Sequence, residues 1–485
     1  MTRSGQEYKD SLRDGREIWI DGERVKDITR HPAFRNTVDS IAGLYDLSHD
    51  SAHSAVLTEG GVHRAFLIPR SYEDLVARRK AHKVWAEASF GYLGRTPDYM
   101  AAGIAGFAAA PGLFTTDTFD GAPNVAAYHR RMSEGDLYPT FTITNPQIDR
   151  TKSAAEQERD DLVVRVVAER DGGIVVRGAK MIGTAAVFGN EVLVGTIEPL
   201  APQDVEHALC FSIPVDTPGL KFISRTSYEA QARSVFDNPL SSRFDENDAL
   251  LVCEDVFVPW ENVLAYRNVD VCFGQWWQTP AYVNFVHQAA TRFWTKLEFL
   301  TGVAILLAKA NNTYQLPPVQ TQIGRLMGWV AQARSMVLAA EAGYEQVDGG
   351  RGGVMPDKEI SYAHRIMAGD LYPRAISEIK LLAGGGVIQL PASAQDLLHP
   401  EIGPVIAKYI RSPGHPAQDR VKLLKLAWDA LGTEFAGRHE QYERFYHGAP
   451  HVYLLQQAWE GDTGACESLA RTCLDGYELQ PLPRA

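Results

Sequence analysis

The sequence predicts an α+β chain of several domains: an N-terminal helical domain, a central β-barrel or sandwich domain and a C-terminal four-helix bundle. With 485 residues, the chain is longer than one ordinary hydrophobic core requires. Short β-rich runs lie in the middle of the chain, and long segments with helical periodicity follow them. We place the domains at residues 1–137, 138–268 and 269–485.

The first domain is predicted to be mainly helical, and the stretch GRTPDYM at Gly94 has the features of a helix start. Thr96 suits the N-cap, and Pro97 suits the first helical position. Capping does not explain Arg95 or Tyr99, since a cation just before a helix opposes the helix dipole. A bound anion or a phenol oxygen would account for Arg95.

The central domain is predicted to be built from short strands. In LYPTFTITNPQIDR, residues 137–150, threonines alternate with Phe141 and Ile143, which is the period of a half-buried strand, and Asn145-Pro146 ends it. Further strands are expected in the ranges 161–169, 174–183, 191–197, 208–216, 219–225 and 249–259. Runs at this spacing, separated by turn residues, favour a compact barrel or sandwich over βαβ units.

Long helical patterns return after residue 268. Phe285, Ala289, Phe293 and Leu297 recur at helical spacing in the first of them. The four long helices are expected in the ranges 282–310, 320–347, 361–382 and 418–431, and four is the number that closes a bundle. The run Gly384–Gly386 is interpreted as a helix end followed by a loop.

Composition argues against several classes of partner and location. The formal charge of −12 disfavours a nucleic-acid partner, because phosphate binding needs an excess of Lys and Arg. The N-terminus lacks the apolar segment of a secretory signal, and the apolar run 101–114 is short and broken by Pro111, so we expect neither secretion nor a membrane span. A cytoplasmic protein is the default expectation. The five cysteines form no C-x-x-C pair and are predicted to be buried thiols.

Common catalytic signatures are absent from the sequence. It contains neither a Gly-rich nicotinamide motif after a strand, nor a P-loop, nor G-x-S-x-G. RHEQYE, beginning at Arg438, resembles the start of H-E-x-x-H but ends in Glu443. We therefore predict no metal site there and expect an exposed helical face on which His439 and Glu443 are in contact.

Six stretches together resemble the oxygenase component of the 4-hydroxyphenylacetate 3-monooxygenase family. They lie in the order of that family and cover nearly the whole chain. They are EYKDSLRDGREIWIDGERVKDITRHPAFRN, GRTPDYM, NPQIDR, VVRGAK followed by Thr184, NPLSSRFDENDALLVCEDVFVPWENVL and KLLKLAWDALGTEFAGRHEQYERFY.

The resemblance implies an acyl-CoA-dehydrogenase-like fold, which agrees with the periodicity, and a homotetramer. It also implies a two-component monooxygenase. A separate reductase would supply reduced FAD, which with O2 would form a flavin peroxide that oxidises a small aromatic substrate ortho to a phenol hydroxyl. Such an enzyme needs no nicotinamide site of its own, in agreement with the missing motif.

The resemblance also implies roles for individual residues. Arg95 would favour a phenolate by its charge, and Tyr99 would donate a hydrogen bond to the substrate oxygen. The flavin contacts carried over from the family are Gln147, Ile148, Asp149, Arg150, Ser153, Thr184, Gly437, Arg438 and His439. From the residues alone, Asp149 and Arg150 are equally well a turn pair, and Thr184 an ordinary strand threonine.

One residue departs from the family pattern. Relatives carry a His where this sequence has Phe141, which can pack but cannot accept a proton. The mild interpretation is that Arg95 and Tyr99 suffice and that Phe141 shapes the pocket for a larger phenol, as in a biosynthetic tailoring enzyme. The sharper hypothesis is oxidation of nitrogen or of another non-phenolic substrate. His287 could replace the missing His if it faces the flavin, although a lone His on an apolar helix usually belongs to the core.

Two further alternatives are less favoured. A flavin-dependent dehydratase or isomerase of the same fold would need Cys ligands for an iron-sulfur cluster, and no Cys precedes Cys210. A non-catalytic flavin-binding homologue is disfavoured because the chain keeps four residues together: Arg95, Tyr99, Arg150 and Thr184. The sequence leaves open whether the substrate is free or bound to a carrier protein.

Overall fold

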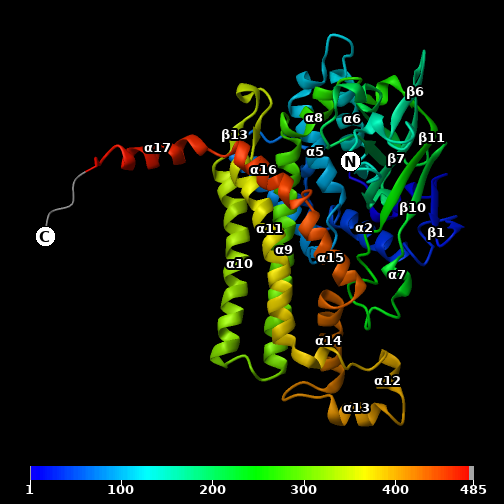
Figure 1. Cartoon of the computed structure of the whole chain (residues 1–485). Helices are drawn as coiled ribbons and strands as arrows, with labels where there is room; N and C mark the ends of the chain where they lie inside the picture. The colour runs from blue at the N-terminus through cyan, green and yellow to red at the C-terminus, as the bar shows by residue number, and fades with distance from the viewer. Residues whose placement is uncertain (1, 480–485) are drawn as a thin grey trace.

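The structure is a computed structural model that describes residues 2–479 (Figure 1). It confirms the predicted order of helices, β-sheets and helical bundle. The N-terminal helices are α1 (Gly5–Ser11), α2 (Arg35–Leu47), α3 (Ser54–Leu57), α4 (Tyr72–Ala88), α5 (Pro97–Ala109) and α6 (Ala122–Glu134). Helix α5 begins at Pro97 with Thr96 as its N-cap, as predicted.

Two sheets form the β region. The larger has the strand order β2-β1-β10-β11-β7-β6, and the smaller has the order β12-β9-β8-β5. The larger sheet contains β1 (Glu17–Ile20), β2 (Glu23–Arg24), β6 (Arg165–Arg170), β7 (Gly173–Thr184), β10 (Leu220–Ser224) and β11 (Asp248–Pro259). The smaller contains β5 (Pro139–Thr142), β8 (Glu191–Val194), β9 (Leu209–Pro214) and β12 (Val263–Tyr266). Two-residue strands pair elsewhere as β3 (Thr58–Glu59) with β4 (Val62–His63), and β13 (Glu345–Gln346) with β14 (Val354–Met355).

The larger sheet recruits a strand from the N-terminal segment. Strand β1 pairs parallel with β10, with Ile18 opposite Phe222. The side chains of β1 alternate, so that Ile18 and Ile20 are buried in the core. An alternating pattern of only four residues is too short to be recognised as a strand in a mainly helical segment. The N-terminal segment is therefore not purely helical, and the domain limits that we drew from the sequence stay a prediction.

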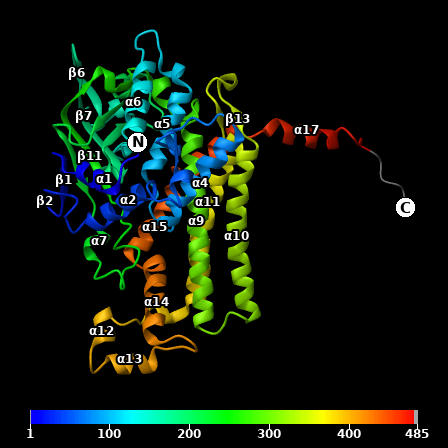
Figure 2. The ribbon, with the colours of Figure 1, turned by 180° about the vertical axis from the view of Figure 1, so that it is seen from behind.

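The bundle is formed by α9 (Ala281–Ala310), α10 (Pro317–Ala342), α11 (Lys358–Ala383) and α14 (Ala417–Leu431), close to the four predicted ranges. Helix α9 packs against α10 and α11 and also against α4 and α5, so it joins the bundle to the N-terminal helices (Figures 1 and 2). Helix α11 ends at Ala383, and Gly384 caps it with a φ of +61°, which suits glycine. The helix end is where we predicted it, but the Gly run continues as a short 3-10 helix, Gly384–Val387, and not as a loop.

Shorter helices complete the chain. They are α7 (Tyr228–Gln231), α8 (Val269–Trp277), α12 (Ala394–Leu398), α13 (Gly403–Tyr409), α15 (Glu434–Phe445), α16 (Pro450–Glu460) and α17 (Thr463–Leu474). Helix α17 projects from the body of the molecule (Figures 1 and 2). Cys210, Cys253 and Cys272 are buried as predicted, but Cys466 and Cys473 are exposed because they lie on this projecting helix.

The described residues bear on two of the predicted absences. Between residues 2 and 479, no helix has the length and apolar content needed to cross a membrane. The same part of the chain holds no group of three or more His, Cys, Asp or Glu side chains that could bind a metal ion.

Candidate active site

A cavity of about 780 Å³ lies where β5, the end of β7, the start of α5 and the end of α15 meet. Its volume is in the range of small-molecule sites. Aromatic residues dominate its wall, with three arginines and one aspartate among them. The lining residues that matter below are Arg95, Tyr99, Phe141, Gln147, Arg150, Ile182, Thr184, Asp248, Trp276, Tyr282, Phe285, Arg438, Tyr442, Tyr446 and His447.

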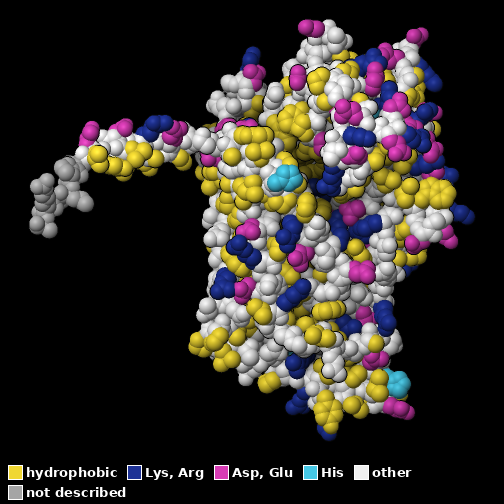
Figure 3. All heavy atoms as spheres, in the orientation of Figure 1, with side chains coloured by type: hydrophobic (Ala, Val, Ile, Leu, Met, Phe, Trp, Pro, Cys, Tyr) yellow, Lys and Arg dark blue, Asp and Glu magenta, His cyan; other side chains and the backbone are white. Residues whose placement is uncertain are grey.

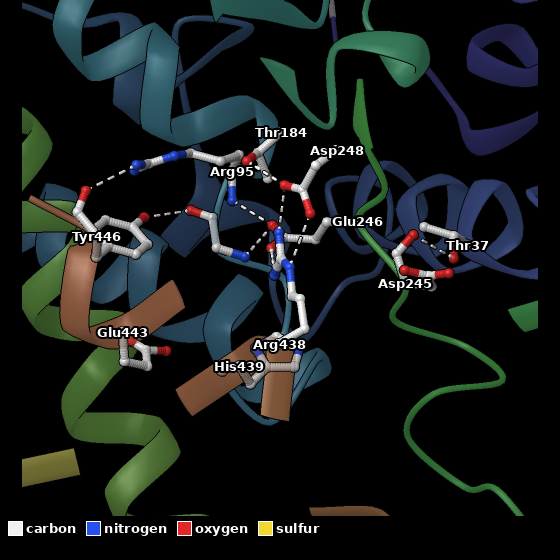
Figure 4. A network of polar contacts seen from close by, with 12 residues as sticks. Thr37, Arg95, Thr184, Asp245, Glu246, Asp248, Arg438, His439, Glu443 and Tyr446 are labelled. Carbon is white, nitrogen blue, oxygen red and sulfur yellow. Dashed lines mark hydrogen bonds and ion pairs between the residues drawn. The ribbon is translucent and has the colours of Figure 1, made fainter. Parts of the chain in front are cut away.

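The main chain around Arg95 is fixed from several directions (Figure 4). The carboxylate of Glu246 accepts hydrogen bonds from the main-chain N–H groups of Gly94 and Arg95, the latter at 2.6 Å. The hydroxyl of Tyr446 donates to the carbonyl of Gly94 at 2.7 Å. Arg95 therefore occupies a preorganised position and does not lie on a free loop.

The Arg95 guanidinium lies among aromatic rings. It is 4.2 Å from the ring centre of Tyr99 and 3.9 Å from that of Tyr446, and Nη2 donates to the main-chain carbonyl of Tyr446 at 3.1 Å. Nη1 is buried and has no hydrogen-bond partner within the described residues. A buried cation with a free donor is suited to an anionic oxygen such as a phenolate.

Tyr99 and Phe141 form one wall of the cavity. The Tyr99 ring stacks on Phe285 at 4.6 Å and on Phe141 at 5.8 Å. Burial raises the pKa of Tyr99 well above its usual value, so its hydroxyl keeps its proton and can donate a hydrogen bond. Thr140 and Thr142 point to the buried side of β5, and the alternation of the strand leaves Phe141 on the cavity side.

The register of β7 and β11 places Thr184 opposite Asp248. The Thr184 hydroxyl donates to Oδ1 of Asp248 at 2.6 Å, so its lone pairs remain available as acceptors. Arg438 also binds this carboxylate (Figure 4), and so does Arg225. Burial would raise the pKa of Asp248, but the two guanidinium groups outweigh burial and hold it well below its usual range.

The end of β7 also presents apolar surface to the cavity. Ile182 has a φ of +58°, which is rare for a β-branched residue, and its side chain is 54% exposed. An exposed isoleucine on a cavity wall offers a flat ring system a contact surface.

The segment after β5 places two of the predicted cofactor residues at the cavity. Gln147 and Arg150 line it, and Arg150 makes no hydrogen bond or ion pair with any residue between 2 and 479. Ile148, Asp149 and Ser153 do not line it. Asp149 accepts hydrogen bonds from the N–H and hydroxyl of Thr151, as a turn residue does, and Ser153 donates to Asp204 at 2.9 Å.

Of the three predicted contacts in α15, Arg438 lines the cavity, whereas Gly437 and His439 do not. His439 is buried, with Nδ1 lying 3.0 Å from Nζ of Lys296. Glu443 is also buried and binds Lys296 and Arg292. The expectation of an exposed face with His439 and Glu443 in contact is therefore wrong, because both side chains turn toward a buried lysine instead.

His287 is also outside the cavity. Its Nε2 lies 2.8 Å from a Glu341 carboxylate oxygen, and its side chain is 1% exposed. Burial lowers the pKa of His287 to about 4, so the ring is neutral. Its position corrects the prediction that it could stand in for the missing histidine: it is a core residue of α9.

Several cavity residues could not be identified from the sequence. Trp276, Tyr282 and Phe285 look like ordinary core aromatics in a helical pattern, and only packing brings them to the cavity. Asp248 lies in one of the six stretches that resemble the family. Its signal in the sequence is a carboxylate at the start of an apolar strand. His447 lies just beyond the last quoted stretch and has no local signal.

Comparisons with known proteins cover nearly the whole chain. A family model described as 4-hydroxyphenylacetate 3-hydroxylase N terminal matches residues 4–265, and one described as the C terminal part of the same enzyme matches residues 272–475. The 4-hydroxyphenylacetate 3-monooxygenase oxygenase component of Pseudomonas aeruginosa is 39% identical, over 98% of this chain and 93% of that protein.

A second relative comes from Streptomyces globisporus. By its name it is a monooxygenase of (3S)-3-amino-3-(3-chloro-4-hydroxyphenyl)propanoyl attached to a peptidyl carrier protein. It is 38% identical over 98% of this chain and 91% of its own length.

Solved structures agree with the sequence matches. The oxygenase component of 4-hydroxyphenylacetate 3-monooxygenase complexed with FAD and 4-hydroxyphenylacetate has a TM-score of 0.93, 34% identity and 98% coverage of both chains. An archaeal 4-hydroxybutyryl-CoA dehydratase of N. maritimus has a TM-score of 0.89 at 20% identity, over 100% of this chain and 97% of its own. At that identity the second match shows the shared fold alone, which confirms the fold class expected from the sequence.

Proposed function

Because the chain belongs to the 4-hydroxyphenylacetate 3-hydroxylase family, we propose that it is the oxygenase component of a two-component, FAD-dependent monooxygenase that hydroxylates a phenol ortho to its hydroxyl group. The strongest support for this proposal is the set of side chains that line one cavity. Arg150, Thr184 and the Arg95–Tyr99 pair all line it. It thus combines groups for an anionic cofactor with groups for a phenol.

The donor set of the cavity fits FAD. Arg150 has no partner in the described chain and is suited to a diphosphate, which a guanidinium binds with two hydrogen bonds. Gln147 adds amide donors and acceptors beside it, Ile182 offers apolar surface to a ring system, and the Thr184 hydroxyl can accept a hydrogen bond. Arg438 is less available, because it is already bound to Asp248 and Glu246.

Reduced FAD, when bound, would supply two electrons to O2, so that one oxygen atom goes to the substrate ring and the other leaves as water. The protein holds the phenol. Arg95 stabilises negative charge on the phenol oxygen, and Tyr99 donates a hydrogen bond to it. The stacked rings of Tyr99, Phe141 and Phe285 keep water from the reacting carbon.

A separate reductase would supply the reduced flavin by diffusion, in agreement with the absence of a nicotinamide motif from the sequence. A biosynthetic substrate, free or attached to a carrier protein, suits the large apolar cavity with Phe141 in its wall. The relative that by its name acts on a carrier-bound substrate supports a substrate of this kind.

Helix α17 supports assembly of the chain with copies of itself, as in the homotetramer we propose. Its Leu469 and Leu474 are 76% and 57% exposed, and apolar side chains line one side of the projecting helix (Figure 3). A helix of 12 residues is marginal in water without a packing partner. Light scattering of the intact chain beside a Leu469→Glu variant tests this: we expect tetramers for the first and smaller species for the second.

The activity is tested by adding chemically reduced FAD to the purified protein with O2 and either 4-hydroxyphenylacetate or 4-aminophenylacetate. Mass spectrometry then shows which compound gains oxygen. Hydroxylation of the phenol at a ring carbon is the expected result. Oxidation of the amine at nitrogen, without any phenol product, would favour the alternative that Phe141 raised.

A further inference from the structure

Phe141 cannot take a proton, so a proton acceptor for the phenol must come from another residue of the cavity. Arg95, Arg150 and Arg438 are cations and have no acceptor. Burial raises the pKa values of Tyr99, Tyr442 and Tyr446, which therefore stay protonated. The Tyr282 hydroxyl is engaged between the carbonyl of His447 and the guanidinium of Arg365.

Asp248 does not qualify either. Its two oxygens are bound by Arg438, Arg225 and the Thr184 hydroxyl, and these partners stabilise the carboxylate in its ionised form. Four hydrogen bonds occupy the acceptor positions of this carboxylate, two on each oxygen, so none is left for a phenol proton.

His447 remains. It is half-buried, it lines the cavity, and neither ring nitrogen has a hydrogen bond to any residue in the described range 2–479. Its main chain is anchored on both sides: the preceding carbonyl, of Tyr446, accepts from Arg95 at 3.1 Å, and its own carbonyl accepts from Tyr282 at 3.0 Å. The peptide group that joins Tyr446 to His447 therefore accepts a hydrogen bond from Arg95, the residue that we assign to the phenol oxygen.

We propose that His447 is a catalytic residue that takes the phenol hydroxyl proton during ring hydroxylation, a task that Phe141 cannot perform. The inference rests on the proposed function. The new C–O bond forms at the ring carbon as an O–O bond breaks: O2, with the two electrons of reduced FAD, supplies the transferred oxygen atom, and its other atom leaves as water. Electron density meanwhile leaves the phenol oxygen, and its O–H proton becomes strongly acidic. That proton moves to a ring nitrogen of His447, and the hydrogen of the attacked carbon leaves as a second proton when the ring regains aromaticity.

The surroundings of His447 keep its ring neutral and ready to accept. Burial lowers its pKa well below the usual value, and the nearby Arg95, Arg292, His364 and Arg365 lower it further. These groups come from the loop before α5, from α9 and from α11, and the Tyr446 ring packs at 5.0 Å. Because a low pKa limits the strength of the base, His447 acts on the acidified proton of the transition state and not on the resting phenol.

The test compares two phenols of different acidity, using holoenzyme with reduced FAD and O2. In a His447→Gln variant, we expect kcat/KM for 4-hydroxyphenylacetate near pH 7 to fall by about 10²–10⁴-fold. For 4-nitrophenol, which is largely ionised before it binds in mildly alkaline buffer, we expect a change of less than about threefold. His451→Gln is the matched control, since His451 is exposed on α16 and does not line the cavity.

The pH profile separates a proton acceptor from a structural residue. For 4-hydroxyphenylacetate, the rate of His447→Gln should rise about tenfold per pH unit from pH 7 toward the phenol pKa of about 10, while the wild-type rate stays nearly flat. Adding Phe141→His to this variant places a new imidazole on the cavity wall and should restore part of the lost activity.

Equal losses with both phenols, or no loss with either, overturn the role of His447. If His447→Gln does not fold, as judged by thermal unfolding, His447→Asn takes its place in the same comparison. If the wild-type protein hydroxylates neither phenol, the proposed function itself fails and this inference fails with it. The proposed function is judged by the activity of the wild-type protein, and the role of His447 by the activity of the variant. Failure of one can therefore be told from failure of the other.

Discussion

Arg438 binds Asp248 through two hydrogen bonds, from Nη2 to Oδ1 at 2.7 Å and from Nε to Oδ2 at 3.0 Å. The two residues are 190 positions apart in the sequence and belong to α15 and β11. Their contact therefore joins the C-terminal region to the larger sheet at the wall of the cavity. It also fixes the carboxylate that accepts the Thr184 hydroxyl.

Removing the Arg438 guanidinium should lower the stability of the fold. In Arg438→Met, Asp248 and Glu246 lose a cation in a largely buried setting, so we expect the free energy of unfolding to fall by about 3 kcal/mol. Urea unfolding measures this. Arg444→Met, on the same helix but exposed, is the control and should change stability by less than about 0.5 kcal/mol. Equal effects of the two substitutions would contradict a special role for the Arg438 pair.

Arg150 should act on the cofactor and not on the fold. It is exposed at the cavity and has no partner in the described chain, so Arg150→Met removes little from the free protein. We expect the Kd for reduced FAD, measured by anaerobic titration, to rise at least about tenfold. Arg159→Met, in the same segment but paired with Asp161, should leave the Kd unchanged. A Kd unaffected by loss of Arg150 would remove it from the cofactor site.

Phe141→His should change the reaction moderately. A histidine there lies on the cavity side of β5 beside Tyr99 and offers the phenol a second acceptor. We expect kcat/KM for 4-hydroxyphenylacetate to rise by up to about tenfold, and Phe141→Leu to give no rise. If the histidine brings no gain in initial rate, position 141 does not set the chemistry.

Acid should weaken the fold through Glu443. Burial alone would raise the pKa of this carboxyl, but Arg292, at 2.6 Å, and Lys296, at 2.9 Å, outweigh burial and lower it to about 2 from 4.5. A depressed pKa means that the contribution to stability is complete above about pH 4.5 and is lost as the pH falls toward 2. That contribution is on the order of 3 kcal/mol.

The prediction is measured by urea unfolding at several pH values. Glu443→Gln should be much less stable than wild type at pH 7, and the difference should shrink between pH 4.5 and pH 2.5. Glu440→Gln, on the more exposed side of the same helix, should follow the wild-type curve. A difference that stays constant with pH would show that Glu443 stabilises the fold by packing and not by its charge.

Periodicity was enough to locate the long elements. The apolar positions of α9, such as Phe293 and Leu297, and the strand pattern around Phe141 lie where the sequence placed them. The GRTPDYM stretch opens a helix and leaves Arg95 at a cavity, because capping residues fix the start of α5 and Arg95 has no role in the cap.

Long-range contacts could not be predicted in this way. Whether a histidine in an apolar helix faces a cavity depends on packing across the bundle, and Glu341 of α10 binds His287 in the core. The Lys296 that holds Glu443 lies 147 residues earlier, so the buried face of α15 could not be inferred from its own sequence. Pairing of β1 with β10 likewise joins segments about 200 residues apart, beyond any local signal.

A single-turnover reaction of the protein with reduced FAD, 4-hydroxyphenylacetate and isotopically labelled O2 is the most direct test of the proposed monooxygenase activity. We expect a catechol product, with the new hydroxyl ortho to the old one and carrying one labelled oxygen atom. Recovery of oxidised FAD and hydrogen peroxide with the phenol unchanged would contradict it.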